Sequence, residues 1–465
     1  MMDLLKVKKI YCVGIKGSGV AAVAQILKAR GFSVSGSDTG EKFFTDAILK
    51  RDAIPYFEVF SPDHLDESID LVIHSTAYSE ENNVEVGKAK ELGLPMLSYP
   101  EMLGVLFNER VGIAVCGSHG KTTTSALLAS VLQKAGLDPG AVIGSQVMDW
   151  DSSVLSGVGE YFVAETDEYQ NKLQYYNPWS AILTSVDWDH PDFFPNVASY
   201  KKAFKDFVAR IPHTGFLVVW GDSVDTIDVA KSTRARIVTY GFGEDSGYRV
   251  TNCDTLSEGA KKIQTFEVIC GEEKMGTFQT SLSGKHNVLN CTAVIALASK
   301  MGIDLEVIRQ AVAGFSGTKR RFEQIGEYNG ALLIDDYAHH PDEIKATLGG
   351  ARTRFPESQI YVVFHPHTFT RTKALLSEFS QSFDDADKVV IIDIYGSARE
   401  EHGGVSSQDL VKLINKYTHE KAEYVPTINE AIEYFSKILK EGDVLITMGA
   451  GDVWKIAEKL KSREA

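Results

Sequence analysis

The sequence lacks the features of membrane-embedded and secreted proteins. No apolar run approaches the about 18 residues that a membrane-spanning helix requires, and the first residues, MMDLLKVKKIYCVG, lack the apolar core of a secretory leader. The five cysteines form no CxxC pair and no disulfide spacing, which is typical of a reducing compartment. These absences predict a soluble, cytoplasmic protein with no membrane partner.

Excess positive charge is also absent. Lysine and arginine number 48 against 63 aspartates and glutamates, a formal net charge of −15. Such a surface would repel a polymer of phosphates, so no nucleic-acid partner is expected, although local basic pockets can still bind small anions. No linker is rich in proline, glycine or serine, and 465 residues are too many for one core, so we expect about three domains.

Residues 111–136 carry the strongest functional signal. An apolar run over 111–116 predicts a buried strand, and a helical pattern then runs to Gly136. Between them lies a turn that contains Gly117, Ser118, His119, Gly120, Lys121, Thr122 and Thr123. A strand, a glycine turn, a lysine-threonine pair and a helix in this order are typical of a phosphate-binding loop.

The chemistry of this turn suits a nucleoside triphosphate. Glycines let backbone N–H groups approach phosphate oxygens, and the helix N-terminus adds partial positive charge. Lys121 would reach the β- and γ-phosphates, and Thr122 would place a hydroxyl on Mg²⁺. Val115 stands where the general pattern has a further glycine. A tight turn with a chance Lys-Thr pair is therefore the alternative.

The pattern of the first hundred residues predicts a doubly wound α/β unit. A predicted strand is followed by a glycine-rich turn over 14–19, a helix pattern, and a second strand that ends at Ser37-Asp38. The glycine spacing is GxxGxG rather than GxGxxG. Three readings stay open: NAD binding with Asp38 on a ribose hydroxyl, binding of another nucleotide diphosphate, or a turn that serves helix packing alone.

The middle of the chain offers a metal site and a second helix of interest. Glu165-Thr166-Asp167-Glu168 follows a predicted buried strand, where carboxylates can bind Mg²⁺; a solvated acidic turn is the alternative. His190 is a softer ligand than Mg²⁺ prefers and could be structural. Alternating residues from about 235 to 285 predict a β-rich insertion, and Asn287 and Asn290 share one face of the helix predicted over 284–302.

The last third repeats the alternation of strands and helices, which predicts another parallel sheet. It opens with Lys319-Arg320-Arg321, a group that could neutralise charge on a transferred phosphoryl group or form a solvated basic edge. Histidines follow predicted strands at 339–340 and at 365 and 367. Backbone groups could equally satisfy these imidazoles.

Taken together, these residues resemble the Mur ligases, the ATP-dependent amide-forming enzymes of peptidoglycan precursor synthesis. The shared motifs run in order through almost the whole chain: VGIKGSGV, SGSD, HSTA, PEML, CGSHGKTTT, AETDEY, DWDHPDFF, HNVLN, GTKRRFE, DDYAHHPDEI, FHPHTFTRT, DIYGSARE and MGAGD. The resemblance implies an α/β protein with the three-domain Mur ligase architecture. Residues 1–108 would be a Rossmann-like domain for a UDP-sugar, 109–317 a central P-loop domain for ATP, and 318–465 a Rossmann-like domain that closes on ATP and binds the amino acid.

The resemblance also implies roles for individual residues. The UDP-sugar would be bound by Gly17, Ser18, Gly19, Ser37, Asp38, Ser75, Thr76 and Ala77. ATP would be bound by residues 117–123 together with Asn287, Asn290, Arg321 and Asp336. Mg²⁺ would be bound by Thr122, Glu165 and His190, and the amino acid by Tyr337, His339, His367 and Arg371.

The implied reaction joins L-alanine to UDP-N-acetylmuramate through an acyl phosphate, with Lys121, Arg321 and His339 as catalytic residues. His339 or His367 could accept the amine proton. Ser118, Ser185 and Thr368 depart from the residues common in the family, so glycine or serine could replace alanine. The alternatives are a ligase that attaches a preformed peptide, an NAD-dependent oxidoreductase, and an ATP-switched binding protein. We expect a monomer or weak homodimer.

Overall fold

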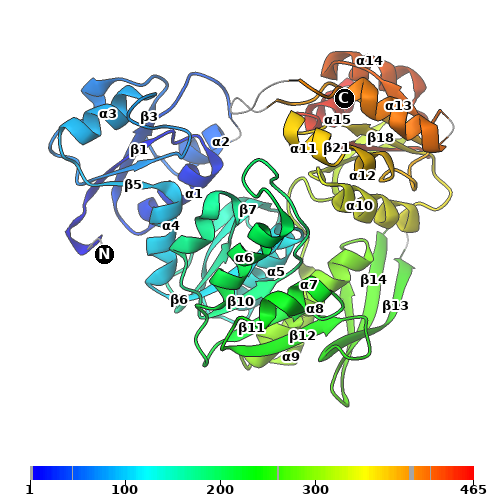
Figure 1. Cartoon of the computed structure of the whole chain (residues 1–465), viewed down its shortest axis with the longest axis horizontal. Helices are drawn as coiled ribbons and strands as arrows, with labels where there is room; N and C mark the ends of the chain where they lie inside the picture. Colours follow the sequence, from blue (N-terminus) through cyan, green and yellow to red (C-terminus); the bar gives the residue numbers. More distant parts are fainter. Residues whose placement is uncertain (1–3, 44, 259–260, 397–402, 419, 465) are drawn as a thin grey trace.

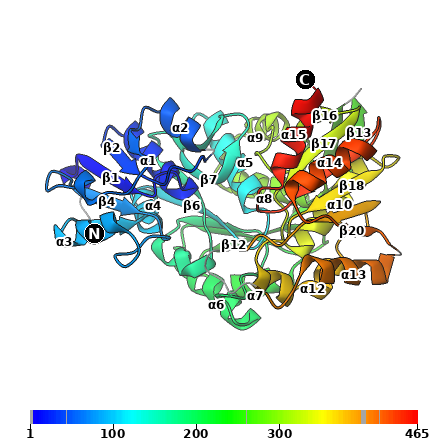
Figure 2. The same ribbon diagram turned by 90° about the horizontal axis from the view of Figure 1, so that it is seen from above.

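The computed structural model describes residues 4–43, 45–258, 261–396, 403–418 and 420–464, and within them three sheets follow one another along the chain (Figure 1). The end of the DIYGSARE motif, from residue 397, lies outside the described residues. Figure 2 shows the same three units from above, with the first sheet and the third at opposite ends of the molecule. The fold is therefore the three-unit α/β arrangement that the sequence predicts.

The first sheet is parallel, with strand order β3-β2-β1-β4-β5. Its strands are β1 (Lys9–Val13), β2 (Ser33–Ser37), β3 (Tyr56–Phe57), β4 (Leu71–His74) and β5 (Met96–Ser98). Its helices are α1 (Ser18–Ala29), α2 (Thr45–Arg51), α3 (Val84–Glu91) and α4 (Tyr99–Asn108), with short 3-10 turns at Leu4–Lys6 and Pro62–His64. The strand order reverses beside β1, which is where doubly wound sheets bind ligands.

The second sheet has ten strands in the order β15-β14-β13-β12-β11-β10-β6-β9-β7-β8. They are β6 (Val111–Cys116), β7 (Gly140–Val147), β8 (Ser152–Ser156), β9 (Tyr161–Glu165), β10 (Ser180–Leu183), β11 (Phe216–Trp220), β12 (Arg236–Gly241), β13 (Tyr248–Glu258), β14 (Lys261–Cys270) and β15 (Glu273–Thr280). Its helices are α5 (Lys121–Lys134), α6 (Val197–Val208), α7 (Val224–Ala230), α8 (Lys285–Lys300) and α9 (Leu305–Gly314), with a 3-10 segment at Tyr169–Tyr175. The expected β-rich insertion extends this sheet, because β13 pairs with β12 and continues into an antiparallel meander.

The third sheet has the order β16-β17-β21-β18-β19-β20. Its strands are β16 (Glu323–Tyr328), β17 (Ala331–Asp336), β18 (Ile360–Phe364), β19 (Lys388–Ile391), β20 (Ala422–Tyr424) and β21 (Val444–Met448). Its helices are α10 (Pro341–Arg354), α11 (Phe369–Ala374), α12 (Leu376–Ser380), α13 (Ser407–Thr418), α14 (Ile428–Ile438) and α15 (Trp454–Glu464). The expected parallel sheet is present, but β16 adds an antiparallel edge that joins β17 through a short hairpin.

The cores of the three units are not equivalent. One apolar cluster runs from Ile10 and Leu106 of the first unit to Ala164 and Phe204 of the second, so these two units share an interior. The third unit has two clusters of its own, one on each face of its sheet. The boundaries after 108 and 317 stay a prediction. No helix among the described residues is long and apolar enough to cross a membrane.

Candidate active site

The turn after β6 is shaped by two glycines whose backbone conformations other residues rarely adopt. Gly117 and Gly120 have φ angles of 126° and 76°. A Cβ on Gly117 would lie 2.3 Å from Thr184 Oγ1, and one on Gly120 would lie 2.6 Å from Asn290 Oδ1. The loop is therefore pressed against the end of β10 and against α8, with the N-terminus of α5 open beside it.

Lys121, the first residue of α5, folds back over this loop. Its Nζ donates to the carbonyls of Gly117 at 2.5 Å and Ser118 at 3.1 Å, and it lies 3.4 Å from Glu168 Oε2. Burial alone would lower the pKa of Lys121, but Glu168 and neighbouring carboxylates outweigh burial and raise it above its ordinary value. The ammonium is therefore charged and held at the loop, where a phosphate could replace its present acceptors.

Thr122 and Glu165 meet as the sequence predicts. Thr122 Oγ1 donates to Glu165 Oε1 at 2.8 Å, and Gly144 N donates to the other carboxylate oxygen at 2.5 Å. A hydroxyl and a carboxylate beside a phosphate loop are the hard oxygen ligands that Mg²⁺ takes, so these two residues fit the ion. His190, the third residue predicted for the ion, also lies in a group with Asp167 and Glu168, whose ligand atoms lie within 4.8 Å of one another.

A cavity of about 310 Å³ opens between the second and third units. Residues predicted to bind ATP line it: His119, Gly120, Thr123, Asn287, Asn290, Arg321 and Asp336. Asn290 Nδ2 donates to Asn287 Oδ1 at 3.1 Å, which holds both amides in one orientation on α8. Trp220 and Tyr240 also line the cavity, and sequence reasoning missed them because they stand in strands whose apolar pattern predicts only core.

The two arginines after Thr318 have different surroundings. Arg320 Nε donates to Asp335 at 3.0 Å, and its Nη2 donates to the carbonyl of Gly449 at 2.7 Å, so it joins β17 to the loop after β21. Arg321 faces the cavity, with its guanidinium 5.2 Å from the centre of the Tyr337 ring. Of the two arginines, Arg321 is the one that lines the cavity.

Asp336 lies at the end of β17 on the same cavity. It accepts hydrogen bonds from the backbone N–H of Phe322 and of Ala338, each at 2.8 Å. Burial raises the pKa of Asp336 to about 6, although Arg321 and the two backbone N–H groups favour the ionised form. This carboxyl can change its charge near neutral pH.

Glu343, in the first turn of α10, links several of these residues and was not predicted. Its Oε1 lies 3.2 Å from His119 Nδ1, and its Oε2 accepts from the backbone N–H of His339 at 3.0 Å. Burial would raise its pKa, but His339, His119 and Arg321 hold the pKa well below its usual range. The signal that could have found it is Pro341 followed by an acidic residue at the third helical position, a helix-start pattern.

The four residues predicted for the amino acid form one cluster. The rings of Tyr337 and His339 lie 5.3 Å apart, those of His339 and His367 lie 6.3 Å apart, and Arg371 Nη1 is 3.4 Å from His367 Nδ1. Burial lowers the pKa of His339 to about 3, so its imidazole is neutral. Arg371 is paired with Asp189 of the second unit.

All three departures from the family pattern have local structural roles. Ser185 Oγ accepts from the backbone N–H of His119 at 3.1 Å, which supports the loop. Thr368 has a φ of 68°, and its side chain accepts from Arg371 N at 3.3 Å as the cap of α11. Ser118 Oγ meets Tyr200 Oη at 2.8 Å and the carbonyl of Asp187 at 2.7 Å, so this hydroxyl is committed to the fold of the loop.

The residues predicted for the UDP-sugar follow the carboxyl ends of β1, β2 and β4, a single edge of the first sheet. Gly17, Ser18 and Gly19 lie at the start of α1, where a Cβ on Gly19 would come 2.5 Å from the ring of Tyr99. Ser37 donates to Glu85, and Ala77 N donates to Ser75 Oγ at 3.2 Å, with Thr76 exposed between them.

Asp38 supports the first glycine-rich turn. One carboxylate oxygen accepts from Lys16 N at 2.7 Å, and the other accepts from Thr39 N at 2.8 Å. Burial raises the pKa of Asp38, although these backbone donors favour its ionised form. The carboxylate therefore stabilises the turn. A sugar hydroxyl that binds Asp38 would donate to an oxygen that already accepts a backbone N–H.

Three family models match the chain in succession. The model described as Mur ligase family, catalytic domain, matches residues 9–110. The Mur ligase middle domain matches residues 115–298, and the model described as Mur ligase, glutamate ligase domain, matches residues 320–451. The three matches follow the three sheets.

Individual relatives match over nearly their whole length. The chain is 42% identical over 453 residues to a UDP-N-acetylmuramate–L-alanine ligase of Desulfitobacterium hafniense strain Y51, covering 97% of this chain and 99% of the relative. The crystal structure of a UDP-N-acetylmuramate–alanine ligase from Thermotoga maritima superposes with a TM-score of 0.82 at 27% identity, covering 98% of each chain. A murein peptide ligase from Psychrobacter arcticus superposes with a TM-score of 0.70 at 26% identity, also over 98% of each chain.

Proposed function

The chain belongs to the Mur ligase family, and we infer that it joins L-alanine to UDP-N-acetylmuramate at the expense of ATP in peptidoglycan precursor synthesis. Identity of 42% over 97% of the chain to a relative of that name carries this conclusion. The phosphate loop, with Lys121 at its edge and Thr122 paired to Glu165, supplies the matching chemistry.

In this proposal ATP enters the cavity between the second and third units. Asn287 and Asn290 approach the adenine, and Asp336 and Arg321 approach the rest of the nucleotide. Lys121 exchanges the carbonyls of its own loop for phosphate oxygens. Thr122 and Glu165 would bind Mg²⁺, with His190 as a further ligand, and the ion would neutralise phosphate charge.

The reaction transfers the γ-phosphoryl group of ATP to the lactyl carboxylate of the sugar nucleotide, giving an acyl phosphate and ADP. Lys121 and Arg321 would stabilise the charge that spreads over the transferring group, and such electrostatic contacts typically contribute about 3 kcal/mol each. The amine of L-alanine then attacks the acyl carbon, loses a proton and expels phosphate. The third unit closes over this step and excludes water from the acyl phosphate.

Two histidines stand beside the proposed amine site. His339 has a pKa of about 3 because it is buried, so in this arrangement it is a weak proton acceptor and would serve chiefly to orient the amine. His367 lies next to Arg371, whose guanidinium would exchange the carboxylate of Asp189 for that of the amino acid. The sugar nucleotide would lie against the first unit, along the edge that contains Gly17, Ser37 and Ser75.

Attachment of a preformed peptide is the second candidate, because a murein peptide ligase shares the fold over 98% of each chain. Identity of 42% over 97% of the chain to a relative named for L-alanine favours the single amino acid. We further propose that the enzyme works in the cytoplasm, where ATP and UDP-sugars are available, as a monomer or weak homodimer. Sedimentation velocity at several concentrations tests the oligomeric state.

Phosphate release from ATP separates the candidates. The enzyme is supplied with UDP-N-acetylmuramate, Mg²⁺ and either L-alanine, glycine, L-serine or a peptide that begins with L-alanine. We expect release to depend on both acid and amine, with the highest kcat/KM for L-alanine. Preference for the peptide would establish the second candidate. Phosphate release at the same rate with and without each amine would contradict ligase activity.

A further inference from the structure

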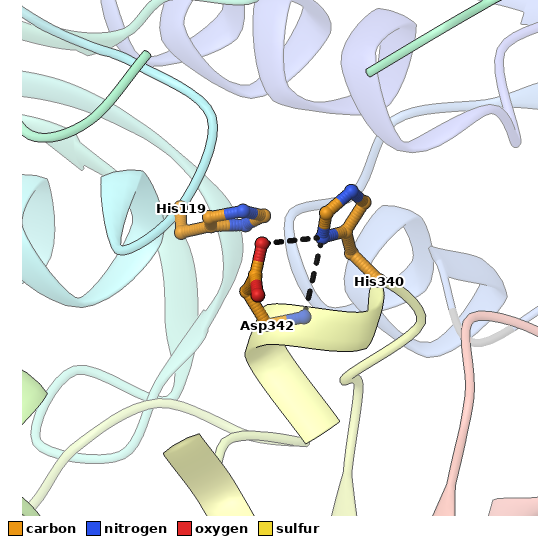
Figure 3. A group of neighbouring side chains, drawn as sticks. All are labelled: His119, His340 and Asp342. Carbon is orange, nitrogen blue, oxygen red and sulfur yellow. Dashed lines mark hydrogen bonds and ion pairs between the residues drawn. The ribbon is translucent and has the colours of Figure 1, made fainter. Parts of the chain in front are cut away.

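Two histidines and an aspartate meet where the phosphate loop faces α10. His119 comes from the loop after β6, and His340 and Asp342 come from the start of α10 in the third unit. Each offers one ligand atom, and these atoms lie within 4.8 Å of one another. Figure 3 shows the carboxylate of Asp342 directed toward both imidazole rings, with His340 Nδ1 3.6 Å from Asp342 Oδ2.

A second observation concerns unused hydrogen-bonding capacity. His340 is 5% exposed, and its Nε2 has no hydrogen-bond partner among the described residues. Nε2 of His119 is likewise buried and without a hydrogen bond there, although it lies 3.6 Å from the carboxylate of Asp187. Buried imidazole nitrogens are normally satisfied, so these two atoms are unused hydrogen-bonding capacity at the cluster; Figure 3 shows His340 Nδ1 on the side of Asp342 and Nε2 on the far side of the ring.

The donor set indicates the class of ligand. Two imidazoles and one carboxylate suit Zn²⁺ and neighbouring transition-metal ions, whereas Mg²⁺ prefers oxygen ligands alone. Ligand atoms around a tetrahedral zinc ion lie roughly 3.3 Å apart, given metal–nitrogen distances of about 2.0 Å. His340 Nδ1 lies 3.6 Å from Asp342 Oδ2, close to this value, and it accepts a long hydrogen bond of 3.4 Å from Asp342 N. An ion bound at Nδ1 would replace that hydrogen bond.

We propose that His119, His340 and Asp342 bind a divalent cation of the zinc class. This site is distinct from the oxygen donors Thr122 and Glu165 at the other end of the loop. Because one ligand belongs to the second unit and two belong to the third, the ion ties these units together. His119 and Asp342 also line the 310 Å³ cavity, so the ion and a nucleotide would influence each other's affinity reciprocally.

Co²⁺ is a suitable probe, because its visible d–d absorption reports tetrahedral coordination without any need for turnover. The nucleotide-free full chain is titrated with Co²⁺ alongside His340→Asn and Asp342→Asn. Asparagine keeps a side-chain acceptor for the cap of α10 while removing the imidazole. Two matched controls accompany them: His213→Asn, an exposed histidine remote in sequence from the cluster, and Glu165→Gln, which alters the proposed magnesium donors.

We expect one tight Co²⁺ per wild-type chain and about tenfold or greater weakening in both cluster variants. His213→Asn and Glu165→Gln should retain wild-type affinity. Equal binding by wild type, His340→Asn and Asp342→Asn would overturn the proposal, as would loss in Glu165→Gln alone. Asp342 has a 56% exposed side chain, so its variant should fold even if His340→Asn does not, and circular dichroism checks both.

Anomalous diffraction from crystals soaked in Zn²⁺ gives an independent answer. A peak between His119, His340 and Asp342 supports the site. A peak found only beside Glu165 and His190, or only on the surface, contradicts it. Neither measurement depends on ligase activity, so failure of the metal site leaves the proposed reaction unaffected.

Discussion

Arg371 of α11 donates to both carboxylate oxygens of Asp189, from Nε at 3.0 Å and from Nη2 at 3.2 Å. Both residues are almost fully buried, and they belong to different units of the chain. Burial would raise the pKa of Asp189, but Arg371 first and nearby histidines next hold it well below its usual range. The pair therefore fixes the third unit against the second.

Arg371→Lys tests whether this guanidinium also binds the amino acid. Lysine keeps the charge but loses the planar fork that matches a carboxylate, so KM for L-alanine should rise at least about tenfold while UDP-sugar affinity stays unchanged. Initial-rate kinetics and calorimetry measure the two quantities. Arg352→Lys is the matched control, since Arg352 contacts only its own unit. An unaltered KM in Arg371→Lys would place the amino acid elsewhere.

Substitution of the neighbouring arginines Arg320 and Arg321 should have different effects, chiefly on stability for Arg320 and chiefly on activity for Arg321. Arg320→Ala leaves the fully buried Asp335 without its ion-pair partner, and we expect the third unit to lose about 3 kcal/mol of unfolding free energy. Arg321→Ala removes a guanidinium that faces the cavity, so kcat should fall at least a hundredfold. The loss of stability should be smaller than in Arg320→Ala, because Arg321 lies 3.9 Å from Glu343, which His119 also contacts. Urea unfolding and phosphate release separate the two effects. Similar losses of stability in both variants would show that Arg321 is structural.

Lys121→Ala should abolish turnover, with a fall of about a thousandfold or more, because it removes the charge beside the phosphate loop. Binding of UDP-N-acetylmuramate should survive, since the first unit lies on a different sheet from this residue. Calorimetric titration with the sugar nucleotide gives the answer, and Lys134→Ala at the far end of α5 is the control. Loss of both turnover and UDP-N-acetylmuramate binding would contradict the proposal that the first unit binds the sugar nucleotide and the second binds ATP.

Glu165→Gln tests the magnesium donors. The amide keeps the shape of the side chain but loses its negative charge, so the Mg²⁺ concentration for half-maximal rate should rise about tenfold or more. Thr122 would keep its hydrogen bond to the remaining carbonyl oxygen. Glu160→Gln, at an exposed position before β9, should leave the Mg²⁺ dependence as in wild type. A Mg²⁺ requirement unaffected by Glu165→Gln would exclude this carboxylate as a ligand.

His339 should stay neutral well below pH 6. Burial lowers its pKa from 6.5 to about 3, so between these values the unfolded chain binds more protons than the folded one. Its contribution to stability is therefore complete above pH 6.5 and is lost as the pH falls toward 3. NMR titration of the imidazole, assigned with His339→Gln, measures this directly. An observed pKa near 6.5 would restore His339 as a strong proton acceptor.

Much of the fold follows from local sequence because its strands are short apolar runs that end in glycine or charge. The run before Gly117 and the run before Asp335 are both strands, and each presents its functional residues at the carboxyl end. The antiparallel strand β16 was not foreseen, because its polar sequence EQIGEY carries no alternation. Its place depends on pairing with β17, which local pattern cannot indicate.

The candidate site was predictable where neighbouring parallel strands of one sheet supply both partners, and less so where the partners come from different units. Thr122 follows the turn after β6 and Glu165 ends β9, and these adjacent parallel strands bring their carboxyl ends together. Glu343 contacts His119 across 224 residues of sequence, and the pairing of Arg371 with Asp189 spans 182. Such pairs depend on how two units meet, which neither composition nor periodicity encodes.

The first two units share one apolar core, so they should move together as a single rigid body. Apolar side chains pack between the first two units. The contacts described between the second and third units are mainly ion pairs and hydrogen bonds. Because the Arg371–Asp189 pair is buried, salt screens it far less than it screens exposed charges, whereas removal of one partner breaks it outright. Loss of that pair should therefore loosen the contact between the second and third units while the first two stay joined, so that the molecule hinges as two rigid pieces rather than three.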